Sequence, residues 1–421
     1  MYDQSFTLKT VRQELRKSDF IKSPRLRSIP IKEQEIDTAV YKAQVEWDIP
    51  HCLTESTIKG KRIFSPKTFS DELLLRKINR NLQKNFNQSE ISRDSVVANL
   101  RELLREGIDY RIYRLDIKSF YESVDHTLIK DRLHTSLLTS VQTKKFVGSI
   151  VEAHALRGLT GVPRGLALSA TLAEIIMADF DNLIKNDSHV RYYGRYVDDI
   201  IIITDKKERA HRFITYIQKS LPNGFELNRS KQAICETNGD VKPHKNGTPA
   251  TKEIDFEYLG YRFQVRSPIL TKMKPSQHYR DVKLDIAHTK VKKTKTRIAK
   301  ALLAYILDRD FDLLLLRLKF LCSNFSVMDA DRDRKRMAGI YFNYHRIDGL
   351  ESESLIELDR YLIKIISSGR GRISSELHSC TTLSQRRILL RISFLQGFLN
   401  KTFLHFSQRK IGELQRCWKY A

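Results

Sequence analysis

The chain has 421 residues, of which 41% are hydrophobic and 29% charged, and this composition excludes a disordered or fibrous protein. At roughly 150 residues per domain, the length predicts two or three domains. The 74 Lys and Arg residues exceed the 50 Asp and Glu residues by 24, and this excess is spread along the chain, which favours nucleic acid over a membrane surface as the partner.

Neither a membrane segment nor a zinc site is predicted. The longest apolar runs, such as residues 200–203 and 313–316, are far shorter than the ~20 residues that span a bilayer. The first residues carry charges and no apolar leader, so we expect a cytoplasmic protein. The five cysteines lack a Cys-x-x-Cys pair and the twelve histidines lack metal-ligand spacing. We therefore expect reduced thiols, and any metal site should use the oxygen ligands that Mg²⁺ prefers.

The first two thirds of the chain mix strands and helices. Residues 1–60 are basic and irregular, so no element is assigned to them. Residues 111–115 are predicted to form a strand, and residues 190–193 and 200–204 a pair of strands. Apolar residues recur at helical spacing over 168–184.

The last third has a different composition. All ten prolines fall at or before Pro275, and residues 276–421 show helical apolar spacing. This segment has 28 Lys and Arg against 15 Asp and Glu, so it carries 13 of the 24 excess positive charges. We expect two domains, 1–275 with an N-terminal extension over 1–60, and a basic all-helical domain over 276–421.

Three carboxylates are predicted to meet at one edge of a sheet. Asp198 and Asp199 lie in a short turn between two strongly apolar strands, where ionised groups are costly without a compensating cation. Taken alone, such a turn is as often simply solvated. Asp116, however, ends another predicted strand, and three converging carboxylates are the ligands that two Mg²⁺ ions ~4 Å apart require for phosphoryl transfer.

These residues resemble the palm of reverse transcriptases. The resemblance rests on Asp116-x-x-x-Phe120-Tyr121 followed by Tyr196-Val197-Asp198-Asp199. Four further motifs occur in the family's order: Arg62-Ile63-x-x-Pro66 in the fingers, the turn Val162 to Ser169, the stretch Gly224 to Lys231, and the primer-grip hairpin Tyr258-Leu259-Gly260-Tyr261. Together they cover about residues 60–265. The resemblance implies an α+β fold with right-hand fingers and palm, followed by an all-α thumb-like domain.

The resemblance also implies roles for individual residues. Asp116 and Asp198 would bridge two Mg²⁺ ions, with Asp199 more peripheral. Lys231 matches a lysine proposed to protonate the pyrophosphate, although an exposed lysine of a basic protein is an equally good interpretation. Tyr121 would exclude the ribose 2′-hydroxyl, the alternative being a core aromatic.

Further residues would bind the nucleotide and the primer. Lys61 and Arg62 would clamp the triphosphate, and the turn with Arg164 and Gly165 would contact template or nucleotide. Tyr258, Leu259 and Gly260 would form the primer grip. Six cations at the thumb position would track a duplex backbone: Lys290, Lys292, Lys293, Lys295, Arg297 and Lys300.

Two features suggest the class of reverse transcriptase: one difference from the family's usual motif, and the C-terminal segment. The family's usual Pro-Gln-Gly is Pro163-Arg164-Gly165 here, and Arg cannot accept a hydrogen bond. With the helical tail, this resembles the bacterial abortive-infection and unknown-group enzymes of antiphage defence. The alternatives are a retron-type enzyme acting on a dedicated structured RNA, and a non-catalytic nucleic-acid scaffold.

The expected partners follow from this class. They are an RNA template or non-coding RNA, the DNA product and deoxynucleoside triphosphates, with a second defence protein or another copy of the chain also considered. Template-independent synthesis is left open.

Overall fold

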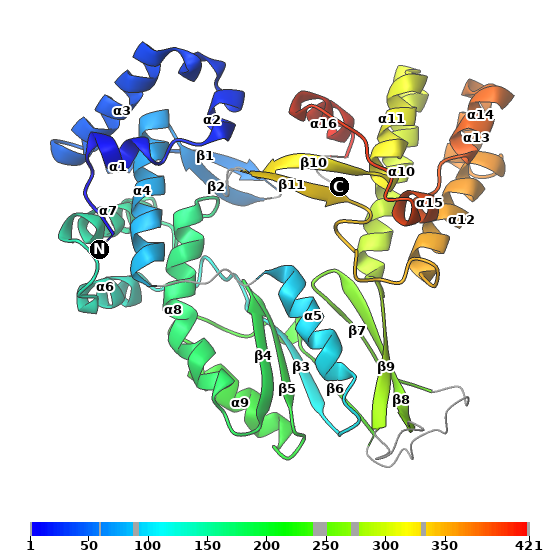
Figure 1. The fold of residues 1–421 in the computed structure, drawn as a ribbon, viewed down its shortest axis with the longest axis horizontal. Coiled ribbons are helices and arrows are strands. Elements are labelled where there is room, and N and C mark those ends of the chain that lie inside the picture. The colour runs from blue at the N-terminus through cyan, green and yellow to red at the C-terminus, as the bar shows by residue number, and fades with distance from the viewer. Residues whose placement is uncertain are drawn as a thin grey trace. The chain divides into compact units, whose positions relative to one another are not determined.

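The computed structural model describes residues 2–58, 60–86, 92–238, 251–270, 278–329 and 334–418 (Figure 1). Helices and strands both build the protein, and the predicted α+β class is confirmed. The chain divides into two compact units: unit 1 contains Met1–Val96 and Asp109–Thr237, and unit 2 contains Val97–Ile108 and Asn238–Ala421. The boundary predicted between 275 and 276 lies outside the described residues.

Unit 1 begins with helices in a segment to which the sequence pattern assigns no element. Thr68 and Asp71 form a capping box that starts α4, and Asp125 and Ser140 cap α6 and α7 through their side chains. The helices of this unit are α1 (Leu8–Arg12), α2 (Lys17–Lys22), α3 (Ile29–Gln44), α4 (Phe69–Asn85), α6 (His126–Thr135), α7 (Val141–Leu156), α8 (Ala167–Lys185) and α9 (Ala210–Ser220). A two-stranded hairpin, β1 (Leu53–Ile58) and β2 (Lys61–Pro66), lies between α3 and α4 in sequence.

A four-stranded antiparallel sheet forms the palm of unit 1, in the order β4-β5-β3-β6. Its strands are β3 (Arg111–Asp116), β4 (Val190–Tyr196), β5 (Asp199–Thr204) and β6 (Ala233–Glu236), so the three strands predicted from sequence are confirmed. Residues 200–203 of β5 are all buried, because the strand is central and apolar without interruption. Helices α8 and α9 lie beside this sheet (Figure 1), and their apolar side chains belong to one hydrophobic core with it.

Unit 2 contains a three-stranded antiparallel sheet and the C-terminal helices. The sheet consists of β7 (Lys252–Tyr258), β8 (Tyr261–Leu270) and β9 (His278–Ile286). The helices are α5 (Arg93–Leu104), which begins in unit 1, and α10 (His288–Asp308), α11 (Phe311–Cys322), α12 (Glu353–Ser367), α13 (Arg372–Cys380), α14 (Leu383–Leu390), α15 (Phe394–Leu399) and α16 (Gln408–Gln415).

The C-terminal third is not helical throughout. Besides β9, it contains a hairpin of β10 (Asn324–Asp329) and β11 (Arg334–Gly339). The buried Asn324 side chain donates to the carbonyl of Thr402 (3.1 Å) and accepts from the amide of Tyr341 (2.8 Å). These partners are distant in sequence, so the apolar spacing that predicted helices could not reveal the hairpin.

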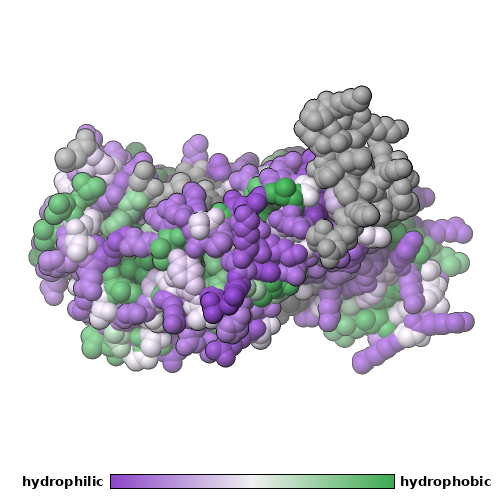
Figure 2. Space-filling view, turned by 90° about the horizontal axis from the view of Figure 1, so that it is seen from below, coloured by the Kyte–Doolittle hydropathy of each residue, from purple (hydrophilic) through white to green (hydrophobic). Residues whose placement is uncertain are grey.

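Three properties expected from the composition can be compared with the structure: the polarity of the surface, the state of the cysteines and the length of apolar helices. On the face drawn in Figure 2, hydrophilic residues predominate and hydrophobic ones lie scattered between them. The five cysteines are free thiols, as expected. Within the described part of the chain, no helix combines the length and the apolar character needed to cross a bilayer.

Candidate active site

The predicted carboxylates meet at one edge of the palm sheet. Asp116 is the last residue of β3 and pairs in register with Asp199, the first residue of β5. The amide of Ile117 donates to the carbonyl of Asp198 at 2.9 Å, which ties the β4–β5 turn to the end of β3. Asp116 is 5% exposed, and Asp198 and Asp199 are half-buried. The structure thus brings all three predicted aspartates together.

A buried arginine holds the turn that carries Asp198. Val197 has a φ of 61°, a left-handed conformation that β-branched residues rarely adopt. Arg195, 4% exposed, donates to the Val197 carbonyl at 3.0 Å. Its guanidinium also pairs with Asp181 and Glu174 of α8, each at 2.6 Å. Burial alone would lower the pKa of Arg195, but the two carboxylates raise it, so the clamp stays charged.

The sequence pattern gives these clamp residues no role. One feature of the sequence could have indicated them: an arginine stands shortly before an Asp-containing turn between two apolar strands. Glu174 and Asp181 are seven residues apart on one helix, which places them on one face. From these two features, an ion pair of Arg195 with Glu174 and Asp181 could have been predicted.

Lys231 and Asn228 contact Asp116 from the following motif. The Lys231 ammonium donates to Asp116 Oδ2 at 2.8 Å, and the Asn228 side chain donates to Oδ1 at 3.0 Å. The Asn228 amide also donates to the Asp116 carbonyl at 2.7 Å. The hydrogen bond to Asp116, followed by the charges of the three aspartates, raises the pKa of Lys231. Asn228 is a further site residue, which the motif around it did not single out.

The chemistry of the aspartates fits a hard divalent cation. Burial, followed by the charges of Asp198 and Asp116, raises the pKa of Asp199, so negative charge at this edge is incompletely compensated. Carboxylate oxygens are the ligands that Mg²⁺ prefers. Among the described residues, no group of three or more His, Cys, Asp or Glu side chains is arranged to hold a metal ion. Lys231 and Asn228 each donate to one oxygen of the Asp116 carboxylate, so a metal bound there would share this carboxylate with both donors.

Tyr121 lies against Arg164. The guanidinium carbon of Arg164 is 5.2 Å from the centre of the Tyr121 ring, and Phe120 packs edge-on at 5.4 Å. Arg164 also forms a two-pronged ion pair with Glu122, with Nη2 2.8 Å from each carboxylate oxygen. Burial, then the charge of Glu174, raises the pKa of Tyr121. Arg164, expected to contact template or nucleotide, here holds the Tyr121 ring.

Gly165 allows a close approach, and the neighbour is the fingers hairpin. Its φ is 104°, and a Cβ there would lie 2.6 Å from both the Phe64 carbonyl oxygen and Cγ2 of Ile63. The Phe64 amide donates to the Arg164 carbonyl at 2.7 Å. The glycine therefore packs the turn against β2, whereas the resemblance implied an approach to template or nucleotide.

Lys61 and Arg62 lie on the exposed β1–β2 hairpin. The Arg62 Nε is 3.3 Å from Glu55 on the neighbouring strand, and half of its side chain is exposed. Both cations are therefore accessible to an anionic ligand at the surface of the fingers. Their binding of a triphosphate stays a prediction.

The predicted primer-grip turn belongs to unit 2. Leu259 (φ 46°) and Gly260 (φ 82°) are both left-handed, as in the type I′ turns that join two antiparallel strands. Tyr258 and Tyr261, on either side, are buried. The amide of Ala287, just before α10, donates to the Gly260 carbonyl at 3.1 Å.

The six predicted thumb cations on α10 divide into two groups. Lys290, Lys292 and Lys293 are exposed. Lys295, Arg297 and Lys300 are half-buried. Lys295 pairs with Glu357 of α12 at 2.5 Å and lies 5.3 Å from the Tyr361 ring centre. Burial lowers the pKa of Arg297. The cations of α10 that are most accessible to a phosphate backbone are therefore the three lysines in its first two turns.

Comparison with known proteins identifies the palm region. Residues 70–263 match the family described as reverse transcriptase (RNA-dependent DNA polymerase). No curated protein matches the chain significantly. Among solved structures, apo telomerase from Candida tropicalis truncated from its C-terminal domain is 14% identical with a TM-score of 0.37, covering 50% of this chain and 52% of that chain.

A second telomerase structure is also similar. Telomerase from Candida albicans, in complex with the TWJ fragment of telomeric RNA, is 14% identical with a TM-score of 0.36, covering 93% of this chain and 56% of that chain. The present chain thus covers little more than half the length of either telomerase. The similarity to the reverse transcriptase family therefore covers residues 70–263, a little under half of the chain.

Proposed function

We propose that the chain is an RNA-directed DNA polymerase whose Asp116, Asp198 and Asp199 hold two Mg²⁺ ions. The observation that carries the proposal is the register of β3 and β5, which sets Asp116 opposite Asp199 within the region that matches the reverse transcriptase family. When bound, the ions would activate the primer 3′-hydroxyl and offset the charge of the triphosphate.

The chain's own residues would complete the site. Lys231 holds a proton beside Asp116, where it could be given to the leaving pyrophosphate. Tyr121 would exclude the ribose 2′-hydroxyl by collision, with Arg164 and Glu122 holding its ring. Lys61 and Arg62 would bind the triphosphate, since exposed cations suit phosphate contact. The turn at 258–260 and the exposed lysines of α10 would hold the primer–template duplex.

We place the enzyme in bacterial antiphage defence. The support is Pro163-Arg164-Gly165 in the family's Pro-Gln-Gly position, together with the basic, mainly helical C-terminal region. Purification from the native host with nucleic acid retained, followed by RNA and protein identification, tests this assignment. Recovery of a non-coding RNA or a second defence protein would support it, and synthesis with the RNA omitted measures template-independent activity.

The activity is tested with Asp198→Asn. Loss of one ligand carboxylate should abolish deoxynucleotide incorporation on an RNA template while leaving the circular dichroism spectrum unchanged. Asp37→Asn, the same change at an exposed aspartate of α3, is the matched control and should retain activity. Incorporation should require Mg²⁺ or Mn²⁺ and resist a zinc-selective chelator. Primer extension by Asp198→Asn at near wild-type rate would show the assignment to be wrong.

A further inference from the structure

Helix α10 starts with a sequence that does not favour a helix start. Its N-cap is Ala287, whose side chain cannot accept a hydrogen bond, and its first turn contains no acidic residue. Lys290, Lys292 and Lys293 follow within the first two turns, near the positive end of the helix dipole. The free amides and the positive charge at this end therefore need compensation from elsewhere.

Glu257, at the end of β7, supplies that compensation. Its Oε1 accepts from the amide of His288 at 2.7 Å, and its Oε2 accepts from the Thr289 hydroxyl at 2.9 Å. Together with the bond from Ala287 to Gly260, these contacts fix the start of α10. Glu257 immediately precedes Tyr258, so one residue links the primer-grip turn to the lysine-bearing end of the helix.

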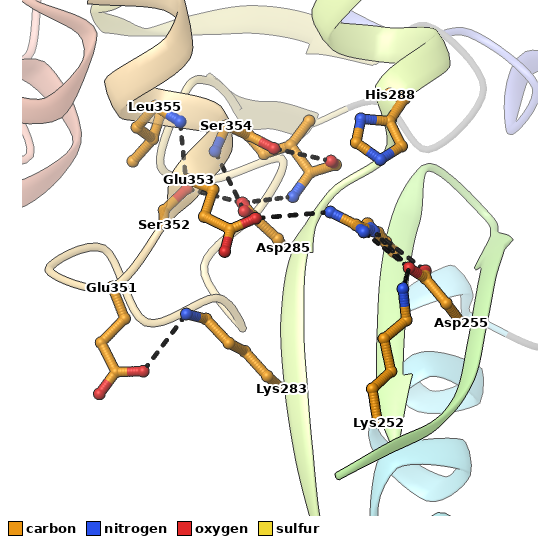
Figure 3. Close-up of polar contacts among 12 residues, drawn as sticks. Lys252, Asp255, Lys283, Asp285, His288, Glu351, Ser352, Glu353, Ser354 and Leu355 are labelled. Carbon is orange, nitrogen blue, oxygen red and sulfur yellow. Dashed lines mark hydrogen bonds and ion pairs between the residues drawn. The ribbon is translucent and has the colours of Figure 1, made fainter. Parts of the chain in front are cut away.

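The neighbouring junction is braced by other residues (Figure 3). The buried Asp285 accepts from the Ser352 hydroxyl at 2.6 Å and from the Ser354 amide at 3.0 Å, which fixes the start of α12 to β9. Arg262 reaches Asp255 at 2.6 Å and Glu353 at 3.6 Å. These contacts hold α12 to the sheet and do not involve Glu257. A change at Glu257 should therefore alter the start of α10 and leave the contacts between α12 and the sheet intact.

We propose that Glu257 is a positioning residue for nucleic-acid binding. It fixes Lys290, Lys292 and Lys293 beside the turn at 258–260, so that turn and helix contact the backbone of one duplex. The inference rests on the proposed function, in which this turn and helix hold the primer–template.

The sign of the effect separates positioning from simple electrostatics. A carboxylate beside a phosphate backbone repels it, so removing the charge of Glu257 should by Coulomb's law tighten nucleic-acid binding. If Glu257 acts by fixing α10, removal should weaken binding, because the lysines lose their placement.

The experiment uses the full chain and a fluorescent RNA–DNA primer–template duplex, with affinity measured by anisotropy over a range of salt. Glu257→Gln and Glu257→Ala should weaken binding roughly five- to tenfold, the size expected from removing a helix cap. They should also flatten the log-affinity against log-salt slope by about 1–3. Glu257→Asp should recover part of the affinity. Glu351→Gln, an exposed carboxylate paired with Lys283 in the same unit, removes the same charge and should bind as wild type or tighter.

A variant with Lys290, Lys292 and Lys293 all changed to Gln completes the test. If Glu257 acts through these lysines, Glu257→Gln should have little further effect in that background. Wild-type or tighter binding by Glu257→Gln, or an equal weakening with and without the lysines, would overturn the proposal. Binding is read without polymerisation, so an inactive wild-type enzyme would count against the proposed function and leave this result interpretable.

Discussion

Two non-glycine residues with left-handed backbone lie at the two turns for which we propose roles in catalysis and primer binding. Val197 precedes Asp198, and Leu259 lies in the primer-grip turn. Such conformations cost free energy, on the order of 1–3 kcal/mol each, and persist where the surroundings hold them. Arg195 holds the first through the Val197 carbonyl. The contacts around each turn, such as the Arg195 hydrogen bond, therefore fix the conformation of that turn.

The Tyr121 ring should determine sugar selection. Tyr121→Ala should lower the preference for deoxynucleotides over ribonucleotides by about tenfold or more, since exclusion works by collision. Glu122→Gln keeps the ring but weakens the ion pair that holds Arg164 on it, so a smaller decrease of roughly two- to fivefold is expected. Competition assays that compare kcat/KM for the two nucleotides measure both. Unchanged selectivity in a folded Tyr121→Ala enzyme would assign the ring to packing.

Asp199 should destabilise the protein at neutral pH. Its pKa is raised by burial and by Asp198 and Asp116, so folding disfavours its charged form. The stabilising contribution of this group is present below its unfolded pKa and is lost as pH rises through the folded pKa. In metal-free buffer, Asp199→Asn should therefore unfold at a higher temperature than wild type near pH 7, and the gap should close towards about pH 4.

Added Mg²⁺ provides the second readout for Asp199. A cation that binds only the folded state raises its unfolding temperature, so Mg²⁺ should stabilise wild type more than Asp199→Asn. Equal unfolding temperatures of the two proteins at all pH values would contradict the assigned charge repulsion.

Helix α10 presents charge of two kinds along its length. Replacing Lys290, Lys292 and Lys293 with Gln should weaken duplex binding across sequences and flatten the salt slope by about 3, because each phosphate that a lysine neutralises contributes about 0.9 to the slope. Lys295→Gln is the matched comparison, since Glu357 already neutralises Lys295, and its slope should stay close to wild type. Equal effects per lysine would mean that overall charge governs binding.

The chain passes between the two units at three points, so unit 2 is completed by residues 97–108. The buried Arg280 donates to the carbonyls of Glu106 (2.7 Å) and Ile108 (2.6 Å) and pairs with Glu253. Leu100 and Leu104 are also fully buried. A fragment truncated before Asn238 would thus lack part of its core and two acceptors of a buried cation.

Removal of residues 97–108 should prevent unit 2 from folding cooperatively. Residues 238–421 expressed alone should lack a cooperative thermal transition, because each missing acceptor costs about 1–3 kcal/mol and the packing of the buried leucines is missing as well. Residues 97–108 joined through a flexible linker should restore the transition in circular dichroism. A cooperative transition of the bare fragment at the same temperature would show that the inserted segment is dispensable.

The sequence by itself determined the α+β class, the three palm strands and the meeting of Asp116, Asp198 and Asp199. These are local properties, because an uninterrupted apolar run marks a central strand and a carboxylate at its end marks the sheet edge. The family motifs added the order of the elements. The hairpin β10–β11 was not predicted, since Asn324 is held by residues far away in the chain.

Only the tertiary structure decided which charged groups pair. Arg195 with Glu174, Arg164 with Glu122 and Glu257 with the start of α10 are separated by 21, 42 and 31 residues. Apolar periodicity records which face of an element turns inward, but the partner of a polar side chain depends on which elements meet and at what angle. For that reason the three aspartates proposed as metal ligands could be predicted from the sequence, while the contacts that hold their turn and the start of α10 in place became visible only in the packing.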